Sequence, residues 1–457
     1  MRGLVPGTCH WESGLLTRPL QSLGLGTRIL CRTLRHLHVW LAFSLIPTLG
    51  LSAEVLNWPA AVQEARANNP RLIAQRAERE KAGHQIDVAR AAFRPHLTAS
   101  ADVSQSITDP APGQGTQTYS VGLTLRQSLF AGFRDEAALE ERRLGAELAQ
   151  TSLDRVEASQ AFELRSAFAR QLYAQLLWDL EKNTALRRRE NVRLVTLRFK
   201  GGRENRGALL RSEATLAQAE VEVAQAQRQL EGTRLLLAHA LGRREDFAQR
   251  VDGTLKTPTL TPTHDLNTLA SAAFSTKESA LGVKTAQAAL ESAAGEAYPD
   301  LSAFATTTRS GPWPPEQDRM VIGLSLSWNL YAGGAPSARL RSQTAAKASA
   351  EAAFTDTLMT AREDLHTAQS GLIDAISQVK VRETLFEAAK LQAEIARRQY
   401  SLGLVTFLDW DQTENALIDA ERSLLASRRD AVLALATWER ARGQRLSDLR
   451  GQELSDP

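Results

Sequence analysis

Four segments of the chain alternate apolar and polar residues with a period of two, and they come in two pairs. In each pair a loop rich in turn-forming residues separates the two segments, at 108–118 and at 310–319. A period of two is that of a β-strand with one apolar and one polar face. Phe304 interrupts the pattern, because it falls among the polar positions of the third segment. The pattern predicts two β-hairpins, with strands over Leu97–Ile107, Tyr119–Leu129, Leu301–Arg309 and Val321–Leu330.

Helical spacing precedes the first hairpin. From Ala60 to Phe93 apolar residues recur at steps of three, four and seven, which predicts a helix. Asn69 and Pro70 mark a break or restart early in this helix, and Pro95 ends it, because proline removes a backbone donor and clashes with the preceding turn.

Each hairpin is followed by a long run with few helix breakers, over Gly132–Gly202 and over Gly333–Gly403. At about 1.5 Å per residue, each run would span on the order of 100 Å as a single helix. A glycine turn then leads into a shorter returning helix, over Gly207–Leu241 and Thr406–Arg442. The apolar residues are spaced nearly as a heptad, which is typical of coiled-coil packing. Residues 242–267 and the tail after Gly443 show no clear pattern.

The second half of the chain repeats the first at a constant offset of 201 residues. Repeats of this kind indicate an internal duplication, and they define the architecture before any single residue does. We therefore expect two equivalent halves, over 54–257 and 258–445, with a tail over 446–457. The matched positions are Gly122/Gly323, Leu123/Leu324, Leu125/Leu326, Leu129/Leu330, Phe130/Tyr331, Gly132/Gly333, Phe199/Tyr400, Gly202/Gly403 and Glu213/Glu414.

Four strands are too few to bury a sheet face or to close a barrel within one chain. Each is about as long as a tilted strand must be to cross a bilayer. Because open sheet edges are not tolerated in hydrocarbon, the strands must close with those of other chains. The sequence thus predicts an α+β membrane protein that combines long antiparallel coiled-coil helices with four transmembrane strands per chain.

The amino terminus carries most of the positive charge. Residues 1–53 hold five arginines and one acidic residue, and the whole chain has 55 basic and 52 acidic residues, so the remainder has a net charge near zero. This balance disfavours nucleic-acid binding. Arginines precede an apolar stretch, Val39–Leu51, and small residues follow it, which predicts a secretory signal peptide cleaved before Glu54.

The residue inventory gives little support to catalysis. Both cysteines, Cys9 and Cys31, lie within residues 1–53, so the mature chain has no disulfide or thiolate metal site. The eight histidines are scattered, and there is no HExxH pair or G-x-S-x-G elbow. We expect neither an enzyme nor a bound cofactor or metal.

In its ordered set of motifs the chain resembles the TolC-like outer-membrane efflux and secretion channels, over roughly residues 56–445. The motifs are Asn69-Pro70, Ala92–Pro95, VGLTLRQSLFAG, IGLSLSWNLYAGG and Tyr400-Ser401-x-Gly403-x-x-Thr406-x-x-Asp409. The resemblance implies a homotrimer with a twelve-stranded barrel in outer-membrane lipid and a helical tunnel in the periplasm of a Gram-negative bacterium. It also implies a passive exit duct for tripartite efflux or type I secretion, opened by a periplasmic adaptor (membrane fusion) protein and an inner-membrane pump.

The resemblance also assigns site residues. Tyr400 matches the family's tyrosine at the periplasmic tip and Asp409 its first pore-facing carboxylate, while the second carboxylate position is Gln412, with Asp411 adjacent. These four residues are the expected pore constriction. The two turns are the expected adaptor-docking tip, through Gly202, Arg203, Gly403, Leu404 and Val405.

Two departures from the family weaken the expected closing bonds. Val405 stands where some family members have an arginine. In the first half, the position equivalent to Asp409 is occupied by Ala208. Asp409 and Asp411 could also be ordinary solvated residues at a helix start, where carboxylates are favoured. We expect Asp409 to face the pore axis and Asp411, about 200° further round the helix, to point toward a neighbour or solvent.

Two other classes of protein remain as alternatives. One is an envelope enzyme, which lacks a catalytic constellation here. The other is a structural coiled-coil or adaptor protein without a pore, which would not carry two membrane-type strand pairs and would not fractionate with the outer membrane.

Overall fold

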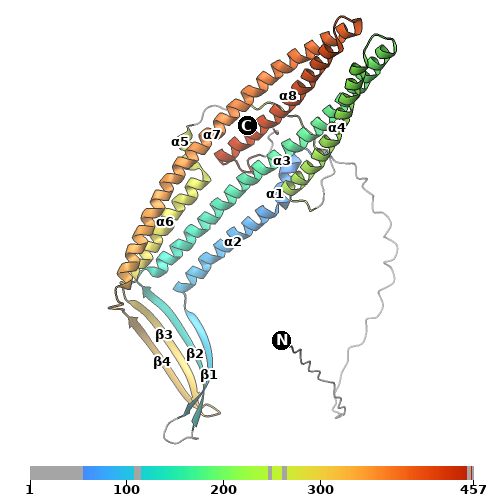
Figure 1. The fold of residues 1–457 in the computed structure, drawn as a ribbon. Helices are drawn as coiled ribbons and strands as arrows, with labels where there is room; N and C mark the ends of the chain where they lie inside the picture. The colour runs from blue at the N-terminus through green and yellow to red at the C-terminus, as the bar shows by residue number, and fades with distance from the viewer. Residues whose placement is uncertain (1–54, 108–114, 245–249, 260–264, 450–453, 455–457) are drawn as a thin grey trace, which may run out of the picture. The chain divides into compact units, whose positions relative to one another are not determined.

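The computed structural model describes residues 55–107, 115–244, 250–259, 265–449 and 454, so the expected signal peptide lies outside the described residues. Residues 53–457 form one compact unit of long helices and a single sheet (Figure 1). The first half comprises α1 (Trp58–Asn68), α2 (Pro70–Arg90), the 3-10 turn η1 (Ala91–Phe93), β1 (His96–Ile107), β2 (Gly115–Ala131), α3 (Arg134–Lys200) and α4 (Arg206–Leu241). The second half comprises α5 (Leu266–Ala272), α6 (Phe274–Gly295), β3 (Asp300–Gly311), β4 (Gln317–Ser327), α7 (Ala335–Leu402) and α8 (Phe407–Arg442).

The four strands form one antiparallel sheet in the order β1-β2-β3-β4. The register aligns apolar residues in rows across all four strands, such as Leu97, Leu125, Ala305 and Ile322. Because directly paired residues share a face, the apolar positions of the sequence pattern lie on one face of the sheet. The predicted α+β architecture and the strand phase are confirmed.

The opposite face of the sheet is polar, with rows such as Thr98, Thr124 and Thr306. Phe304, which interrupts the sequence pattern, lies on this polar face opposite Gly323. A Cβ atom at Gly323 would lie 3.0 Å from the Phe304 ring, so the absence of a side chain makes room for the aromatic group.

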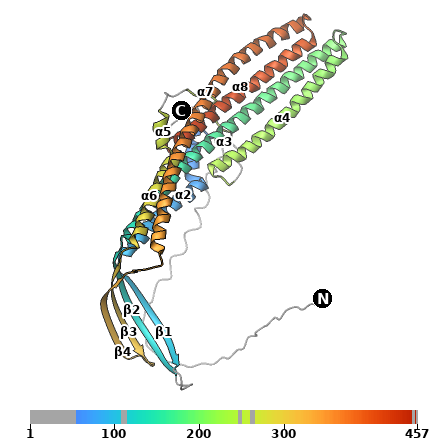
Figure 2. The same ribbon diagram turned by 60° about the vertical axis from the view of Figure 1, so that its left-hand side comes forward.

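The two helical hairpins repeat at the offset seen in the sequence. α3 begins at Arg134 and α7 at Ala335, and α4 begins at Arg206 and α8 at Phe407, 201 residues apart in both cases. α3 has 67 residues and α7 has 68, so each is about 100 Å long at a rise of about 1.5 Å per residue. Both hairpins run side by side and turn at the end that is remote from the strands (Figure 2). No helix in the described ranges is both long enough and apolar enough to span a membrane.

Two parts of the described fold, residues 266–295 and 444–449, are not predicted by the sequence pattern. α5 and α6 occupy residues 266–295, and α6 packs against both α3 and α7. The tail after Gly443 shows no clear pattern in the sequence, and in the structure its Leu446 and Leu449 are buried in the main core. This core lies where α1, α3 and α4 meet, and Trp58 makes an edge contact with Phe168 there, at 5.4 Å between ring centroids.

The strand boundaries also differ slightly from the sequence pattern. β2 starts four residues before Tyr119 and continues to Ala131, whereas β4 ends at Ser327 although the alternation continues to Leu330. β2 has a partner strand on each side, whereas β4 has a partner on one side only. Backbone hydrogen bonds to two neighbours therefore stabilise β2, and hydrogen bonds to one neighbour stabilise β4.

Candidate functional site at the helical turns

The two helical turns, here called the tip (residues 198–211 and 396–415), are held together within one subunit. Arg198 of α3 donates to the backbone oxygen of Tyr400 on α7, and its guanidinium lies over the tyrosine ring, 4.4 Å from the centroid. The Tyr400 hydroxyl donates to Glu204, in the first turn, at 3.0 Å. The first hairpin therefore contacts the backbone, the ring and the hydroxyl of one tyrosine of the second hairpin.

An aromatic cluster fills the interior of the tip. Tyr400 stacks on Trp410, with 4.5 Å between the ring centroids and 12° between the planes, and Phe407 meets both rings edge-on. Tyr400 is buried with Ala208 of α4 in the same cluster. Burial, helped by the hydrogen bond to Glu204, raises the pKa of Tyr400 well above its ordinary value, so the hydroxyl remains a donor at neutral pH. The ring expected at the pore constriction thus lies inside the subunit.

Asp409 is exposed and takes part in the start of α8. The Thr406 hydroxyl and backbone N–H donate to its carboxylate at 2.6 and 3.2 Å, and its own backbone N–H donates back to the Thr406 hydroxyl at 3.2 Å. This reciprocal pair is a capping box, which satisfies two backbone donors that a helix start would otherwise leave without partners. The carboxylate also remains accessible from outside the subunit.

Asp411 has the opposite environment and is only 3% exposed. Its carboxylate lies 3.3 Å from Nη1 of Arg188 on α3 and 2.9 Å from Nε of Arg211 on α4. Arg188 also donates to the side chain of Asn415. We expected Asp411 to point toward a neighbour or toward solvent, and in the structure it points toward the neighbouring helices α3 and α4. Its carboxylate is therefore not on the surface of the subunit.

The remaining expected site residues lie on the surface of the tip. Gln412, Gly202, Arg203 and Gly403 are exposed, and Leu404 is 70% exposed, whereas Val405 is half-buried. Between the turns lies an open cavity of about 470 Å³, with Arg203, Glu204, Arg211, Tyr400, Val405 and Phe407 among its lining residues. The first turn contributes mainly charged groups to this surface and the second turn mainly apolar ones.

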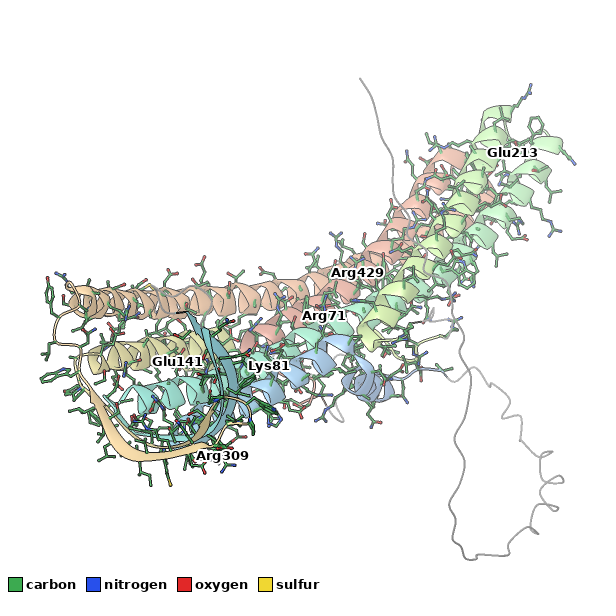
Figure 3. All side chains as sticks on the ribbon, turned by 90° about the horizontal axis from the view of Figure 1, so that it is seen from below. Arg71, Lys81, Glu141, Glu213, Arg309 and Arg429 are labelled. Carbon is green, nitrogen blue, oxygen red and sulfur yellow. The ribbon has the colours of Figure 1, made fainter. Side chains whose placement is uncertain are left out.

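Sequence reasoning missed the arginines that join α8 to α3 and α4. Arg422 of α8 binds both oxygens of Glu181 on α3, at 2.8 and 2.6 Å, and also contacts Glu222 on α4. Further along the same helices, Arg429, which is labelled in Figure 3, lies over the Tyr173 ring, 4.4 Å from the ring centroid. Each arginine belongs to the second half of the chain and its partners to the first, so only the three-dimensional packing reveals the pairs.

A buried ion pair lies at the base of this contact between α3 and α8. Arg165 Nη1 is 2.8 Å from Glu439, and both side chains are almost fully buried. Burial raises the pKa of Glu439 to about 7, although Arg165 and Arg442 act in the opposite direction. Among the residues that the structure describes, no group of three or more histidine, cysteine, aspartate or glutamate side chains could hold a metal ion.

Known proteins are similar to this chain over most of its length. The sequence model of the family described as Outer membrane efflux protein matches residues 61–243 and 267–444. The chain is 23% identical over 421 residues to the outer membrane efflux protein BepC of Brucella suis, with 89% of this chain and 91% of BepC covered. It is 25% identical over 437 residues to the alkaline protease secretion protein AprF of Pseudomonas aeruginosa, with 90% and 88% covered.

The fold is also similar to that of solved structures. The outer membrane protein VceC of Vibrio cholerae superposes with a TM-score of 0.73 at 19% identity, over 84% of this chain and 95% of VceC. At this level of identity the similarity establishes the architecture, and the tip residues must be interpreted from their own contacts.

Proposed function

The chain belongs to the outer membrane efflux protein family and acts in the outer membrane, with a large periplasmic part, and we propose that three copies form a passive exit duct for tripartite efflux or type I secretion. The name of BepC refers to efflux and that of AprF to protease secretion. This difference fits a common duct whose cargo is chosen by the inner-membrane pump. The duct itself carries out no catalysis in this proposal.

The observation that carries the proposal is the exposed apolar face of the sheet. Ile322, Leu324 and Leu326 all stand exposed on β4, and Leu97 and Val103 do so on β1. A soluble protein rarely leaves a contiguous apolar surface of this kind open to water. Lipid is the environment in which such a face is stable, with the polar face of the same sheet turned to an aqueous lumen.

Aromatic pairs at both ends of the strands support this orientation. Tyr119 and Trp313 meet edge-on at 5.4 Å at one end, and Phe130, Phe133 and Tyr298 cluster at 5.3–6.4 Å at the other. From Tyr119 to Phe130 the strand rises roughly 37 Å at ~3.4 Å per residue, or roughly 26 Å along the normal at a tilt of ~45°. Rings at this separation match the two aromatic girdles that flank the apolar band of outer-membrane barrels.

The tip is the proposed periplasmic gate. Asp409 and Gln412 lie on its surface and would face the axis of the assembled duct, so that three copies of Asp409 form a ring of negative charge. Tyr400 and Asp411 would support the closed state from inside each subunit, because both join the second hairpin to the first. Such a ring would favour cations over anions in a narrow mouth of low dielectric constant.

The exposed turns are the proposed contact with a periplasmic adaptor protein. Gly202, Arg203, Gly403 and Leu404 are accessible, and Val405 is accessible in part. The adaptor would link the duct to the inner-membrane pump and open it by separating the two hairpins of each subunit.

The decisive experiment combines fractionation with conductance. The protein should fractionate with the outer membrane and, after purification, should insert into planar bilayers as a cation-selective channel. Asp409→Asn should lower the cation selectivity, and Glu213→Gln, on an exposed part of α4 (Figure 3), serves as the matched control. A trimer that inserts without conducting would indicate a structural protein instead of a duct.

A further inference from the structure

The polar face of the sheet carries mostly small side chains, and one row across the strands is an exception. In this row His96 of β1 lies opposite Arg126 of β2, and Arg126 lies opposite Phe304 of β3. His96 is the first residue of β1, so the row lies at the end of the sheet that adjoins the helices. The next row outward consists mainly of threonines. An imidazole, a guanidinium and a benzyl group therefore project from one row of a wall that is lined mainly by hydroxyl groups.

Arg126 and Phe304 both depart from the repeat. The residue 201 positions after Arg126 is Ser327, and β3 begins 204 positions after β1, which makes Ser100 the counterpart of Phe304. Both serines lie on the same polar face. The duplicated wall therefore has a small hydroxylated side chain at the counterpart of each position, and the two bulky groups share a single row.

The guanidinium of Arg126 is available to a ligand. The side chain is exposed, and it makes no hydrogen bond or ion pair with any residue that the structure describes. The Phe304 ring leans away from it, because the ring fills the space above Gly323, on the other side of β3. Asp300, the acidic residue at the start of β3, is paired with Arg134. The N–H donors of the Arg126 guanidinium therefore remain open to a bound molecule.

One acidic residue lies close to Arg126 on this face without contacting it. Asp135, at the start of α3, accepts a hydrogen bond at 3.1 Å from Ser128, two residues along β2 from Arg126. Arg319 and Asp102 lie four and six residues further out, or ~14 and ~20 Å along the strands. These distances exceed the Debye length of ~8 Å at physiological ionic strength, so screening weakens their effect. Asp135 therefore reduces the local positive potential in part and leaves the guanidinium uncovered.

The dimensions of the assembled barrel bring three copies of this row within reach of one ligand. Three sheets of four strands, ~4.8 Å apart and tilted by ~45°, have a circumference of about 81 Å and a diameter of about 26 Å. Side chains that reach roughly 7 Å inward leave an opening of about 12 Å. Neighbours in the row differ in height by about 3 Å at this tilt, so the copies of His96, Arg126 and Phe304 form three rings stacked within about 7 Å.

We infer that these three rings, here called the barrel band (His96, Arg126 and Phe304 of each copy), bind amphipathic organic anions. The inference rests on the proposed function, because the rings close only around the lumen of the duct, and it names a chemical class of cargo. The guanidinium groups bind a carboxylate, sulfonate or phosphate through paired N–H donors, since the planar fork matches the geometry of these groups. The Phe304 ring packs against the aromatic or aliphatic body of the same molecule.

The barrel band and the proposed Asp409 ring act at opposite ends of the duct. The long helices separate them by about 100 Å, which is far more than a Debye length. The narrow tip therefore sets the selectivity for small ions, and the barrel band adds affinity for anions that carry an apolar body. Rings of arginine are one way in which pores favour anions and phosphates.

Binding of pyrene-1,3,6,8-tetrasulfonate to the solubilised oligomer, followed by fluorescence anisotropy, tests the barrel band. The unmodified protein should bind this aromatic anion, and citrate, which has charge but no apolar body, should displace it only at much higher concentration. Arg126→Gln should weaken binding about tenfold, the factor expected for one lost charge-assisted hydrogen bond, and Phe304→Ser about fivefold. Both substitutions place a polar side chain on the lumen face, where such changes tune selectivity.

Arg309→Gln is the matched control, because it removes the same charge from the opposite face of the sheet. Arg309, which is labelled in Figure 3, lies opposite Val121 on the apolar face and donates to both oxygens of Asp318 at 2.6 and 2.7 Å. This variant should bind the probe with the affinity of the unmodified protein.

The outcomes separate this inference from the proposed function. Equal losses in Arg126→Gln and Arg309→Gln would indicate a general attraction to positive charge and would overturn the inference. Absence of binding in an oligomer that conducts would overturn it and leave the duct intact. An oligomer that binds the probe without conducting would refute the duct and support the barrel band as a binding site. If Arg126→Gln yields no oligomer, Arg126→Lys provides the test: it keeps the charge and loses the planar fork, so unchanged affinity would contradict the paired contact.

Discussion

Asp411 offers the sharpest test of how the tip is held closed. Its carboxylate is shared by Arg188, whose side chain is 7% exposed, and Arg211, which is 50% exposed. Asp411→Asn keeps the shape of the side chain and removes its charge, so the two guanidinium groups lose their common counter-charge. Removal of one partner from a buried ion pair costs about 3–5 kcal/mol, and an exposed pair is worth at most about 1 kcal/mol.

For Asp411→Asn we expect a loss of stability near the lower end of the range for a buried ion pair. Arg188 keeps its hydrogen bond to Asn415, and Arg211 can turn toward solvent, so about 3 kcal/mol is a reasonable magnitude. At about 1.4 kcal/mol per factor of ten, the equilibrium between the docked and separated hairpins should shift by about a hundredfold. Hydrogen exchange should accelerate by this factor in peptides that cover the start of α8 and the facing part of α3, and conductance should rise.

Asp409→Asn is the matched control, because it makes the same chemical change two residues away at an exposed position. It leaves the buried ion pairs intact and affects only the capping box, at a cost of up to about 1 kcal/mol. We expect Asp409→Asn to lower the cation selectivity and to leave hydrogen exchange in the tip nearly unchanged. If Asp411→Asn exchanged like wild type while Asp409→Asn opened the tip, the assignment of the internal support to Asp411 would be refuted.

Three further predictions concern the rest of the molecule. Leu324→Arg should impair membrane assembly by about 2–4 kcal/mol if it lies near the midplane, whereas Ser325→Arg on the polar face should be tolerated; equal yields of folded oligomer would contradict the strand phase. The solubilised mature protein should sediment as a trimer without disulfides, and a stable monomer with native strand content would exclude barrel closure between chains. Because the pKa of Glu439 is raised from 4.5 to about 7, the folded state binds the proton more tightly, so this residue should make unfolding harder as pH falls from about 7 toward 4.5. Glu439→Gln should remove that part of the pH dependence of the melting temperature, and an unchanged profile would show that Arg165 keeps the carboxylate ionised.

The repeat explains why so much of the fold could be predicted. The offset of 201 residues located both helical hairpins, and the alternation located four strands with the correct apolar face. α6 was missed because its sequence is rich in alanine and lacks a strong apolar stripe, although its counterpart α2 was recognised. Applying the duplication to α2, at the offset that relates Pro95 to Pro299, would have revealed it.

The tip shows where sequence reasoning stops. Helical periodicity correctly separates Asp409 from Asp411, since residues two apart lie on different sides of a helix. It cannot decide which side meets another helix, because that depends on Arg188 and Arg211, which are more than 190 residues away in sequence. Tyr400 illustrates the same limit: its position in the tip was predicted, and its burial against Trp410 follows only from the packing of both hairpins.

The two halves of the chain differ in the length of the loop that joins the two strands of each hairpin, and this difference has an evolutionary consequence. β1 and β3 are 204 residues apart, whereas Gly122 and Gly323 on the following strands are 201 apart, so the difference falls at the loops that join the strands. The long helices have kept their offset throughout. One residue inserted into α7 would rotate everything beyond it by about 100°, and α8 would present a different face to Arg188. Insertions and deletions should therefore accumulate among relatives in the strand loops, where surface epitopes can diversify, while the hairpin lengths remain fixed.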